Sequence, residues 1–210
     1  MPRGPWIARV PRRTRVHRNE RQGNTPRRLV PGGRFGADHL FALGGSRRII
    51  GRMIDERDRE YLTRAVELAE AGLAAGDDPF GSVLVSADGT VLFEDHNHVA
   101  GGDGTQHPEF NIARWSASHL SAEDRATATV YTSGEHCPMC AAAHAWVGLG
   151  RIVYASSSEQ LVGWLHELGV PDPPVRPLPI GEIAPGLVVE GPVPELAERV
   201  HRLHQQKHGA

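Results

Sequence analysis

Both cysteines of this chain lie in one short stretch, residues 134–140, which reads GEHCPMC. Two thiols separated by two residues can form a disulfide or share one metal ion. A Cys-Pro-x-Cys pair in an α/β protein of a reducing compartment is typical of thiol-disulfide oxidoreductases. By itself, the stretch leaves both chemistries open, a redox pair and a metal site.

A histidine and a glutamate upstream favour the metal site. His107 and Cys137 both stand where a loop ends and a predicted helix begins, and the partial positive charge of a helix start favours thiolate over thiol. If the two helices lie side by side, His107, Cys137 and Cys140 supply three ligands. The fourth tetrahedral position then stays open to water, as in catalytic zinc sites. Glu109, two residues after His107, is placed to carry protons to and from that water.

The two parts of the chain differ in charge. Residues 1–52 hold 13 arginines and two acidic residues, whereas residues 53–210 hold the other 10 basic and 23 acidic residues. The first part is rich in Arg, Pro and Gly and lacks a helical or strand period, so we expect a disordered basic N-terminal extension. Three interpretations of it stay open: a segment outside the native protein, which begins at Met53; a basic arm for anionic partners; or a transit peptide.

Periodicity divides residues 53–210 into alternating helices and strands. Apolar stripes at helical spacing predict helices over residues 55–75, 108–119, 138–149, 159–168 and 194–206. Short apolar runs predict strands over residues 80–85, 91–93, 127–131, 152–155 and 187–190. This alternation predicts one domain of the α/β class, with helices packed around a five-stranded sheet.

The motifs, in their order, resemble a known enzyme superfamily. HPE at residues 107–109 followed by CPMC at 137–140 is similar to the signature of the zinc-dependent cytidine/deoxycytidylate deaminases. The similarity runs from about residue 56 to the C-terminus and includes DPFG at 78–81 and Asn97. It looks most like the branch that contains guanine deaminases, yeast-type cytosine deaminases and tRNA adenosine deaminases.

The resemblance implies a three-layer α/β/α sandwich with a central mixed five-stranded sheet, and makes residues 53–210 a deaminase domain. It implies a Zn²⁺ cofactor held by His107, Cys137 and Cys140, and a homodimer or larger assembly. Two positions depart from the branch: Pro108 stands where Ala is usual, and His136 where Pro is usual.

Four residues are assigned roles through the resemblance. Glu109 is the expected proton shuttle, and Asn97 matches an asparagine that hydrogen-bonds the base. Asn97 is also an ordinary turn residue after a strand. Phe80 matches a position near the base pocket, although it could equally belong to the core. We expect specificity to be set by His136 and by the loop over residues 156–164, unless the His136 side chain points away.

The function implied is hydrolytic deamination of a small nucleobase or nucleoside of the guanine, cytosine or adenine type, with release of ammonia. A tRNA adenosine deaminase is the alternative, but RNA needs basic residues, and the chain has one lysine and an acidic 53–210 part. A thiol-disulfide oxidoreductase is the alternative of another class. Two cysteines and the absence of an apolar run of ~20 residues predict a cytoplasmic protein without a membrane partner.

Overall fold

The computed structural model describes residues 53–209, so the prediction made for residues 1–52 lies outside the described residues. Along this part the elements are, in order, α1 (Glu56–Ala74), β1 (Gly81–Val85), β2 (Val91–His96), the 3₁₀ turn η1 (Val99–Gly101), α2 (Pro108–His119), α3 (Ala122–Thr127), β3 (Thr129–Gly134), α4 (Pro138–Val147), β4 (Arg151–Ser156), α5 (Ser158–Glu167), α6 (Ile180–Ile183), β5 (Val189–Glu190) and α7 (Pro194–His208).

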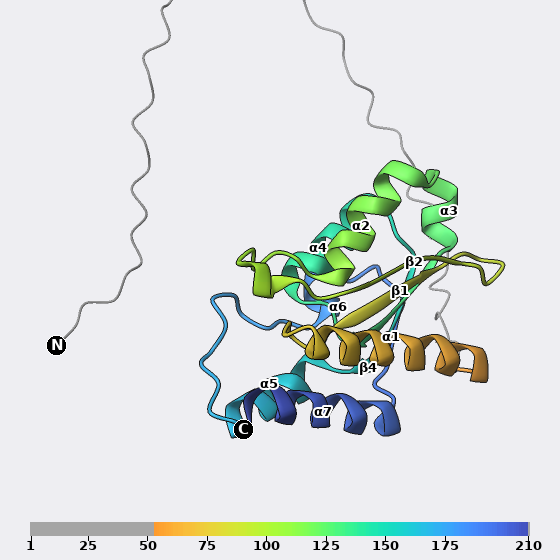
Figure 1. Ribbon diagram of the computed structural model, residues 1–210. Coiled ribbons are helices and arrows are strands. Elements are labelled where there is room, and N and C mark those ends of the chain that lie inside the picture. Colours follow the sequence, from red (N-terminus) through yellow and green to blue (C-terminus); the bar gives the residue numbers. More distant parts are fainter. Residues whose placement is uncertain (1–52, 210) are drawn as a thin grey trace, which may run out of the picture. The chain divides into compact units, whose positions relative to one another are not determined.

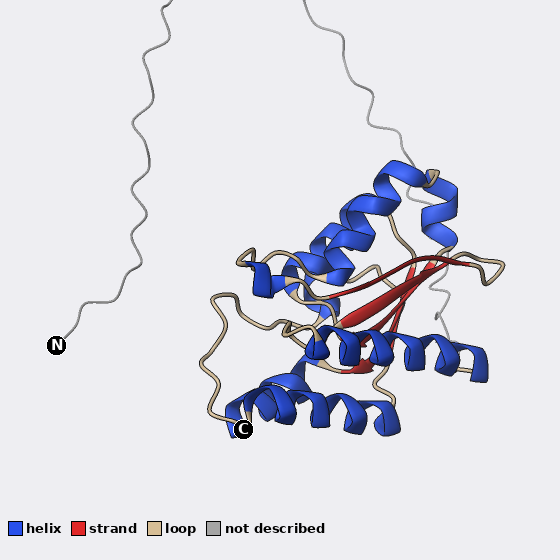
Figure 2. Cartoon of the chain, viewed as in Figure 1, coloured by secondary structure: helices blue, strands red, loops and turns tan. Residues whose placement is uncertain are grey.

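The five strands form one mixed sheet in the order β2-β1-β3-β4-β5. β1 is antiparallel to both β2 and β3, whereas β3, β4 and β5 run parallel to one another. Helices α1, α5 and α7 cover one face, and α2 and α4 cover the other (Figures 1 and 2). The predicted three-layer α/β/α sandwich with a mixed five-stranded sheet is therefore confirmed.

Three apolar clusters of described residues hold the layers together, the smallest of which joins Ala141 on α4 to Ile152 on β4. The first joins the stripes of α1 and α7 to one face of the sheet, through residues such as Leu62, Val66, Val83 and Val200. The second joins α2 to the opposite face through Ile112, Leu84 and Val130. Strand β1 is buried along its whole length, as expected for a strand covered on both faces.

The predicted strand over residues 127–131 is misplaced at its start. Residues 122–127 form helix α3, because Ser121 accepts a hydrogen bond from the backbone N–H of Asp124 and caps the helix. The strand begins at Thr129 and continues to Gly134, directly before the cysteine stretch. Strand β2 likewise extends beyond its predicted end to His96 and brings the following residue, Asn97, to the same end of the sheet as Gly81.

Candidate metal and active site

Three potential ligand atoms meet where β3, α2 and α4 come together. The Nδ1 atom of His107 lies 3.6 Å from the sulfur of Cys137 and 3.6 Å from that of Cys140, and the two sulfurs are 3.5 Å apart. A tetrahedral zinc ion with bonds of about 2.0–2.3 Å needs ligand atoms separated by roughly 3.5 Å. The triangle therefore fits a zinc ion with a fourth position open, and both cysteines are free thiols.

The same local structure places the ligands on two different helices. His107 is the N-cap of α2 and Cys137 is the N-cap of α4, both in extended backbone conformation, and each is followed by proline at the first helical position. Proline is well suited to that position because its missing N–H would have no helical partner. Pro108 stands where the deaminases that this chain resembles usually have alanine. It occupies the first position of α2, as Pro138 occupies the first position of α4, and suits the start of that helix in the same way.

The thiols carry strongly shifted proton affinities. The hydrogen bond between the two thiols lowers the pKa of Cys137 to about 4, with a further contribution from His107. The same contact and burial raise the pKa of Cys140 well above its ordinary value. The hydrogen bond with Cys137 raises the pKa of His107. A metal ion bound here would displace the protons that remain on these ligands.

Glu109 lies beneath this triangle and is only 5% exposed. Its Oε1 atom accepts hydrogen bonds from the hydroxyls of Ser82, at 2.9 Å, and Thr132, at 3.0 Å. Ser82 and Thr132 are cross-strand partners on β1 and β3. Burial raises the pKa of Glu109, although the charge of His107 and the Ser82 hydroxyl oppose this. Two hydroxyl groups therefore fix the position of the carboxyl group, and no Arg or Lys of the described residues pairs with it to keep it ionised.

Asn97 and Phe80 lie at the same end of the sheet. The backbone N–H of Asn97 donates to the carbonyl of Phe80, and its side-chain oxygen accepts the N–H of Val99 at 3.0 Å. The oxygen thus serves a turn, while the side-chain amide nitrogen makes no hydrogen bond to a described residue. The ring of Phe80 lies beside Gly134 and edge-on to His204, with centroids 5.3 Å apart.

His136 is fully buried rather than open to solvent. It is 1% exposed, packs edge-on against His144 with ring centroids 5.3 Å apart, and neither ring nitrogen has a hydrogen-bond partner among the described residues. Burial lowers the pKa of His136 well below the ordinary value. The role predicted for it in substrate binding stays a prediction.

Two further residues in this region were not foreseen. The segment expected as a specificity loop over 156–164 is the end of β4 followed by α5. The carboxylate of Glu135 accepts the backbone N–H of Ser158, at 2.8 Å, and of Ile180, at 2.9 Å. The second is His204 on α7, which is 1% exposed and packs between Phe80 and Trp164.

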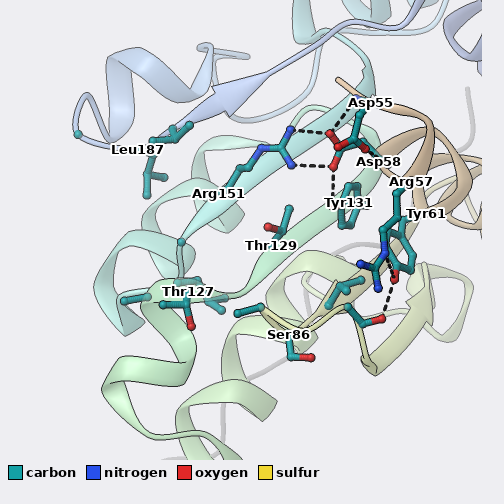
Figure 3. A pocket seen from close by; sticks show the side chains of 18 residues that line it. Asp55, Arg57, Asp58, Tyr61, Ser86, Thr127, Thr129, Tyr131, Arg151 and Leu187 are labelled. Carbon is teal, nitrogen blue, oxygen red and sulfur yellow. Dashed lines mark hydrogen bonds and ion pairs between the residues drawn. The ribbon is translucent and has the colours of Figure 1, made fainter. Parts of the chain in front are cut away.

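A pocket of about 570 Å³ lies away from the triangle, bordered by the starts of α1 and β4 (Figure 3). Arg151 spans it and pairs with Asp58 at 2.7 Å and with Glu190. Asp58 also accepts the hydroxyl of Tyr131 at 2.7 Å. Arg151 thus offsets the charge of two carboxylates, although one oxygen of Glu190 has no hydrogen-bond partner among the described residues. We assign this pocket to stability rather than to the reaction.

Comparison with known proteins shows to which family the chain belongs. The profile of the cytidine and deoxycytidylate deaminase zinc-binding region matches residues 55–156. A probable cytosine deaminase of Schizosaccharomyces pombe is 31% identical over 116 residues, which cover 55% of this chain and 70% of the relative. The chain belongs to this deaminase family. As a member, it has zinc as its expected cofactor, and the triangle of His107, Cys137 and Cys140 is a group that fits the ion.

Other family members show how far the likeness reaches. A guanine deaminase of Bacillus subtilis is 39% identical over 98 residues, covering 46% of this deaminase and 62% of that relative. The solved guanine deaminase of Nitrosomonas europaea superposes with a TM-score of 0.56 at 22% identity, over 74% of this chain and 86% of that one. At such identity, the superposition supports the shared fold.

None of the helices within residues 53–209 is long and apolar enough to cross a membrane.

Proposed function

We propose that this chain catalyses zinc-dependent hydrolytic deamination of a small nucleobase or nucleoside of the guanine, cytosine or adenine type, with residues 53–210 as the deaminase domain. The observation that carries the proposal is the triangle of His107, Cys137 and Cys140, with ligand atoms 3.5–3.6 Å apart, above a buried glutamate. Water would add to the ring carbon that carries the exocyclic amine, and ammonia would leave.

Each residue of the site has a proposed part in this reaction. Zinc held by His107, Cys137 and Cys140 would supply Lewis acidity that makes a coordinated water more acidic. Glu109 would accept a proton from the attacking water and pass it to the ring nitrogen, then take the proton of the added hydroxyl group and deliver it to the departing amine. Its raised pKa suits both directions of transfer, because the protonated form is not disfavoured by a neighbouring Arg or Lys.

Three residues are proposed to contact the substrate. Asn97 would donate from its side-chain amide nitrogen to a base carbonyl or ring atom, because its oxygen is already used in the turn. Phe80 would form an apolar wall of the base pocket. His136, which lies next to Cys137, would set specificity through its unpaired ring nitrogens, provided that the surrounding side chains move when a base binds.

The substrate screen is the experiment that tests this function. Purified full-length chain would be assayed for ammonia release from free bases and nucleosides, with zinc content measured on the same sample. About one zinc per chain at this site and chelator-sensitive ammonia release from one of these compounds would support the proposal. A chain without zinc that instead forms a reversible Cys137–Cys140 disulfide would favour the thiol-disulfide oxidoreductase.

The tRNA adenosine deaminase is the second candidate within the same chemistry. Phosphate contacts need lysine and arginine, and residues 53–210 carry 23 acidic against 10 basic residues. We therefore place a small molecule first. Inosine formation in tRNA without ammonia release from any free base or nucleoside would reverse that order.

A homodimer and a cytoplasmic location are further parts of the proposal. Trp146 on α4 is 88% exposed, which is costly for so large an apolar side chain unless a partner covers it. Light scattering after size exclusion should give twice the mass of 22.8 kDa. Replacing Trp146 by Glu should shift the particle towards the monomer if α4 lies in the interface.

A further inference from the structure

A second group of metal-binding side chains lies outside the triangle. Asp77 follows α1, His96 ends β2 and His98 precedes η1, yet one ligand atom from each lies within 4.8 Å of the other two. The imidazole rings of His96 and His98 have centroids 4.3 Å apart. The deamination chemistry proposed above uses none of these three side chains.

Both histidines carry the outer hydrogen bond that is typical of metal ligands. Nδ1 of His96 lies 2.8 Å from the carbonyl oxygen of Asn97, and Nε2 of His98 lies 2.8 Å from the Asp95 carboxylate. Histidine ligands almost always donate their second ring N–H to a carbonyl or a carboxylate in this way, which fixes the tautomer and leaves a lone pair on the other nitrogen. Among the described residues, neither ring makes a second hydrogen bond.

The carboxylate of Asp77 is buried and forms no salt bridge with a residue that the structure describes. The residue is 7% exposed, and one of its oxygens accepts the backbone N–H of Ala100 at 2.7 Å. The amine of Lys207 comes close, but it donates to the carbonyls of Gly76 and Asp77 and approaches the carboxylate of Asp78 instead. A buried anion needs a compensating charge, and a divalent cation would provide it.

We propose that Asp77, His96 and His98 form a second metal site, for a divalent ion of the Zn²⁺, Co²⁺ or Ni²⁺ class. Two imidazoles and one carboxylate suit these ions. The His98 side chain is 47% exposed, so the site opens to solvent and would keep water in its remaining positions. It differs from the first site in having nitrogen and oxygen ligands and no sulfur.

An ion at this second site would fix the turn around Asn97. That residue stands between the two histidine ligands, its side chain holds the N–H of Val99, and Asp77 holds the N–H of Ala100. The ion would therefore join the end of β2, the loop after α1 and η1 into one rigid unit. Any effect on substrate affinity rests on the proposed function, so the decisive test measures metal binding rather than activity.

The test is a Co²⁺ titration of the tag-free, full-length, metal-free chain, followed by calorimetry and visible absorption. We expect two equivalents, of which only one produces a sulfur-to-cobalt charge-transfer band. His98→Gln and Asp77→Asn should each weaken the equivalent without this band by at least about tenfold, and leave the other unchanged. Cys137→Ser should remove the band and keep the second equivalent.

Two histidine variants serve as matched controls. His166→Gln changes an exposed histidine on α5, and His208→Gln changes one at the end of α7; neither should alter the second equivalent. A single equivalent in the wild-type chain would overturn the proposal. So would a second equivalent that persists in His98→Gln or disappears in His208→Gln. Failure of the deaminase proposal would appear separately: the Co²⁺ equivalent that produces the sulfur-to-cobalt band would be missing, or no ammonia would be released.

Discussion

Two buried carboxylates lie on opposite faces of the sheet, Asp58 on α1 and Glu109 on α2, and neighbouring residues of β3 contact them. Tyr131 donates to Asp58, and Thr132, the next residue, donates to Glu109. Successive side chains of a strand point to opposite faces, so one strand serves both groups. The two carboxylates are almost equally buried, at 3% and 5% exposure.

Their partners give them opposite proton affinities. Burial alone would raise the pKa of Asp58, but hydrogen bonds from Arg151 and Tyr131 outweigh it and lower the pKa to about 2. Glu109 accepts hydrogen bonds from the neutral hydroxyls of Ser82 and Thr132, forms no ion pair with an Arg or Lys among the described residues, and has a pKa that burial raises. A buried carboxylate with a fixed cation stays ionised and stabilises the fold, whereas one with neutral donors can exchange a proton.

The largest expected effect comes from Glu109→Gln, which keeps the shape and removes the proton exchange. Turnover should fall by roughly 10²–10⁴-fold, the range of general acid–base catalysis, while zinc content stays unchanged. Ammonia release and metal analysis on one preparation would measure both. Glu123→Gln, an exposed glutamate on α3, is the control. Full activity in Glu109→Gln would end the proposed role.

On the other face, Arg151→Met should affect stability more than any surface change. It leaves the carboxylates of Asp58 and Glu190 buried without their cation, which costs about 3–5 kcal/mol of unfolding free energy. Urea denaturation would measure it. The double variant Asp58→Asn/Arg151→Met should recover part of the loss; an unchanged loss would mean that the charge pairing is not its cause.

The hydroxyl donors of Glu109 should have a smaller effect on turnover. Ser82→Ala should lower activity by roughly tenfold or more, since it removes a hydrogen bond to a carboxylate that is worth about 1.5–3 kcal/mol. Thr132→Val should act similarly. Because both hydroxyls bond the same oxygen, the double variant should cost less than the product of the two single losses. A purely multiplicative result would mean that the two hydroxyls act independently of each other.

The low pKa of Asp58 predicts how the stability of the fold depends on pH. The folded pKa of Asp58 is about 2, below its ordinary 3.8, so its stabilisation is complete above about pH 4 and lost as pH falls through 2. Its contribution near neutral pH is roughly 2 kcal/mol. Urea midpoints of the wild type and Asp58→Asn should therefore converge between pH 4 and pH 2. Parallel curves would contradict the assignment.

The smallest effect is expected at a surface pair. Arg64 and Glu94 are joined by two hydrogen bonds of 2.9 Å, but their side chains are 46% and 30% exposed. Glu94→Gln should cost less than about 1 kcal/mol by urea denaturation. A loss as large as that of Arg151→Met would show that burial is not what distinguishes the two ion pairs.

The sequence was sufficient to predict that His107, Cys137 and Cys140 come together and that five strands alternate with helices, because both depend on local pattern. Two helix starts, each with a potential ligand followed by proline, are visible at residues 107 and 137, and five apolar runs predict five strands. The pattern of α7 also held an overlooked signal. His204 lies four residues after Val200, on the same helical stripe, and is buried with it.

The partners of Glu109 were harder to foresee. Ser82 and Thr132 are far apart in the chain and become neighbours only through the register of β1 with β3. Their one local signal is a hydroxyl side chain inside a strand that is otherwise apolar. The burial of His136 was equally hard to foresee, because it depends on the packing of His144, on α4, against its ring.

The hydrogen bonds of Glu135 bear on where this domain can be cut. The family match ends at residue 156, yet the two backbone donors to this carboxylate, Ser158 and Ile180, lie beyond that point. A chain shortened to the matched region would lose both donors next to the stretch that carries the two cysteines. The segment after residue 156 therefore helps to hold Glu135 in place, and a change of sequence there can reach the proposed metal ligands through this one carboxylate.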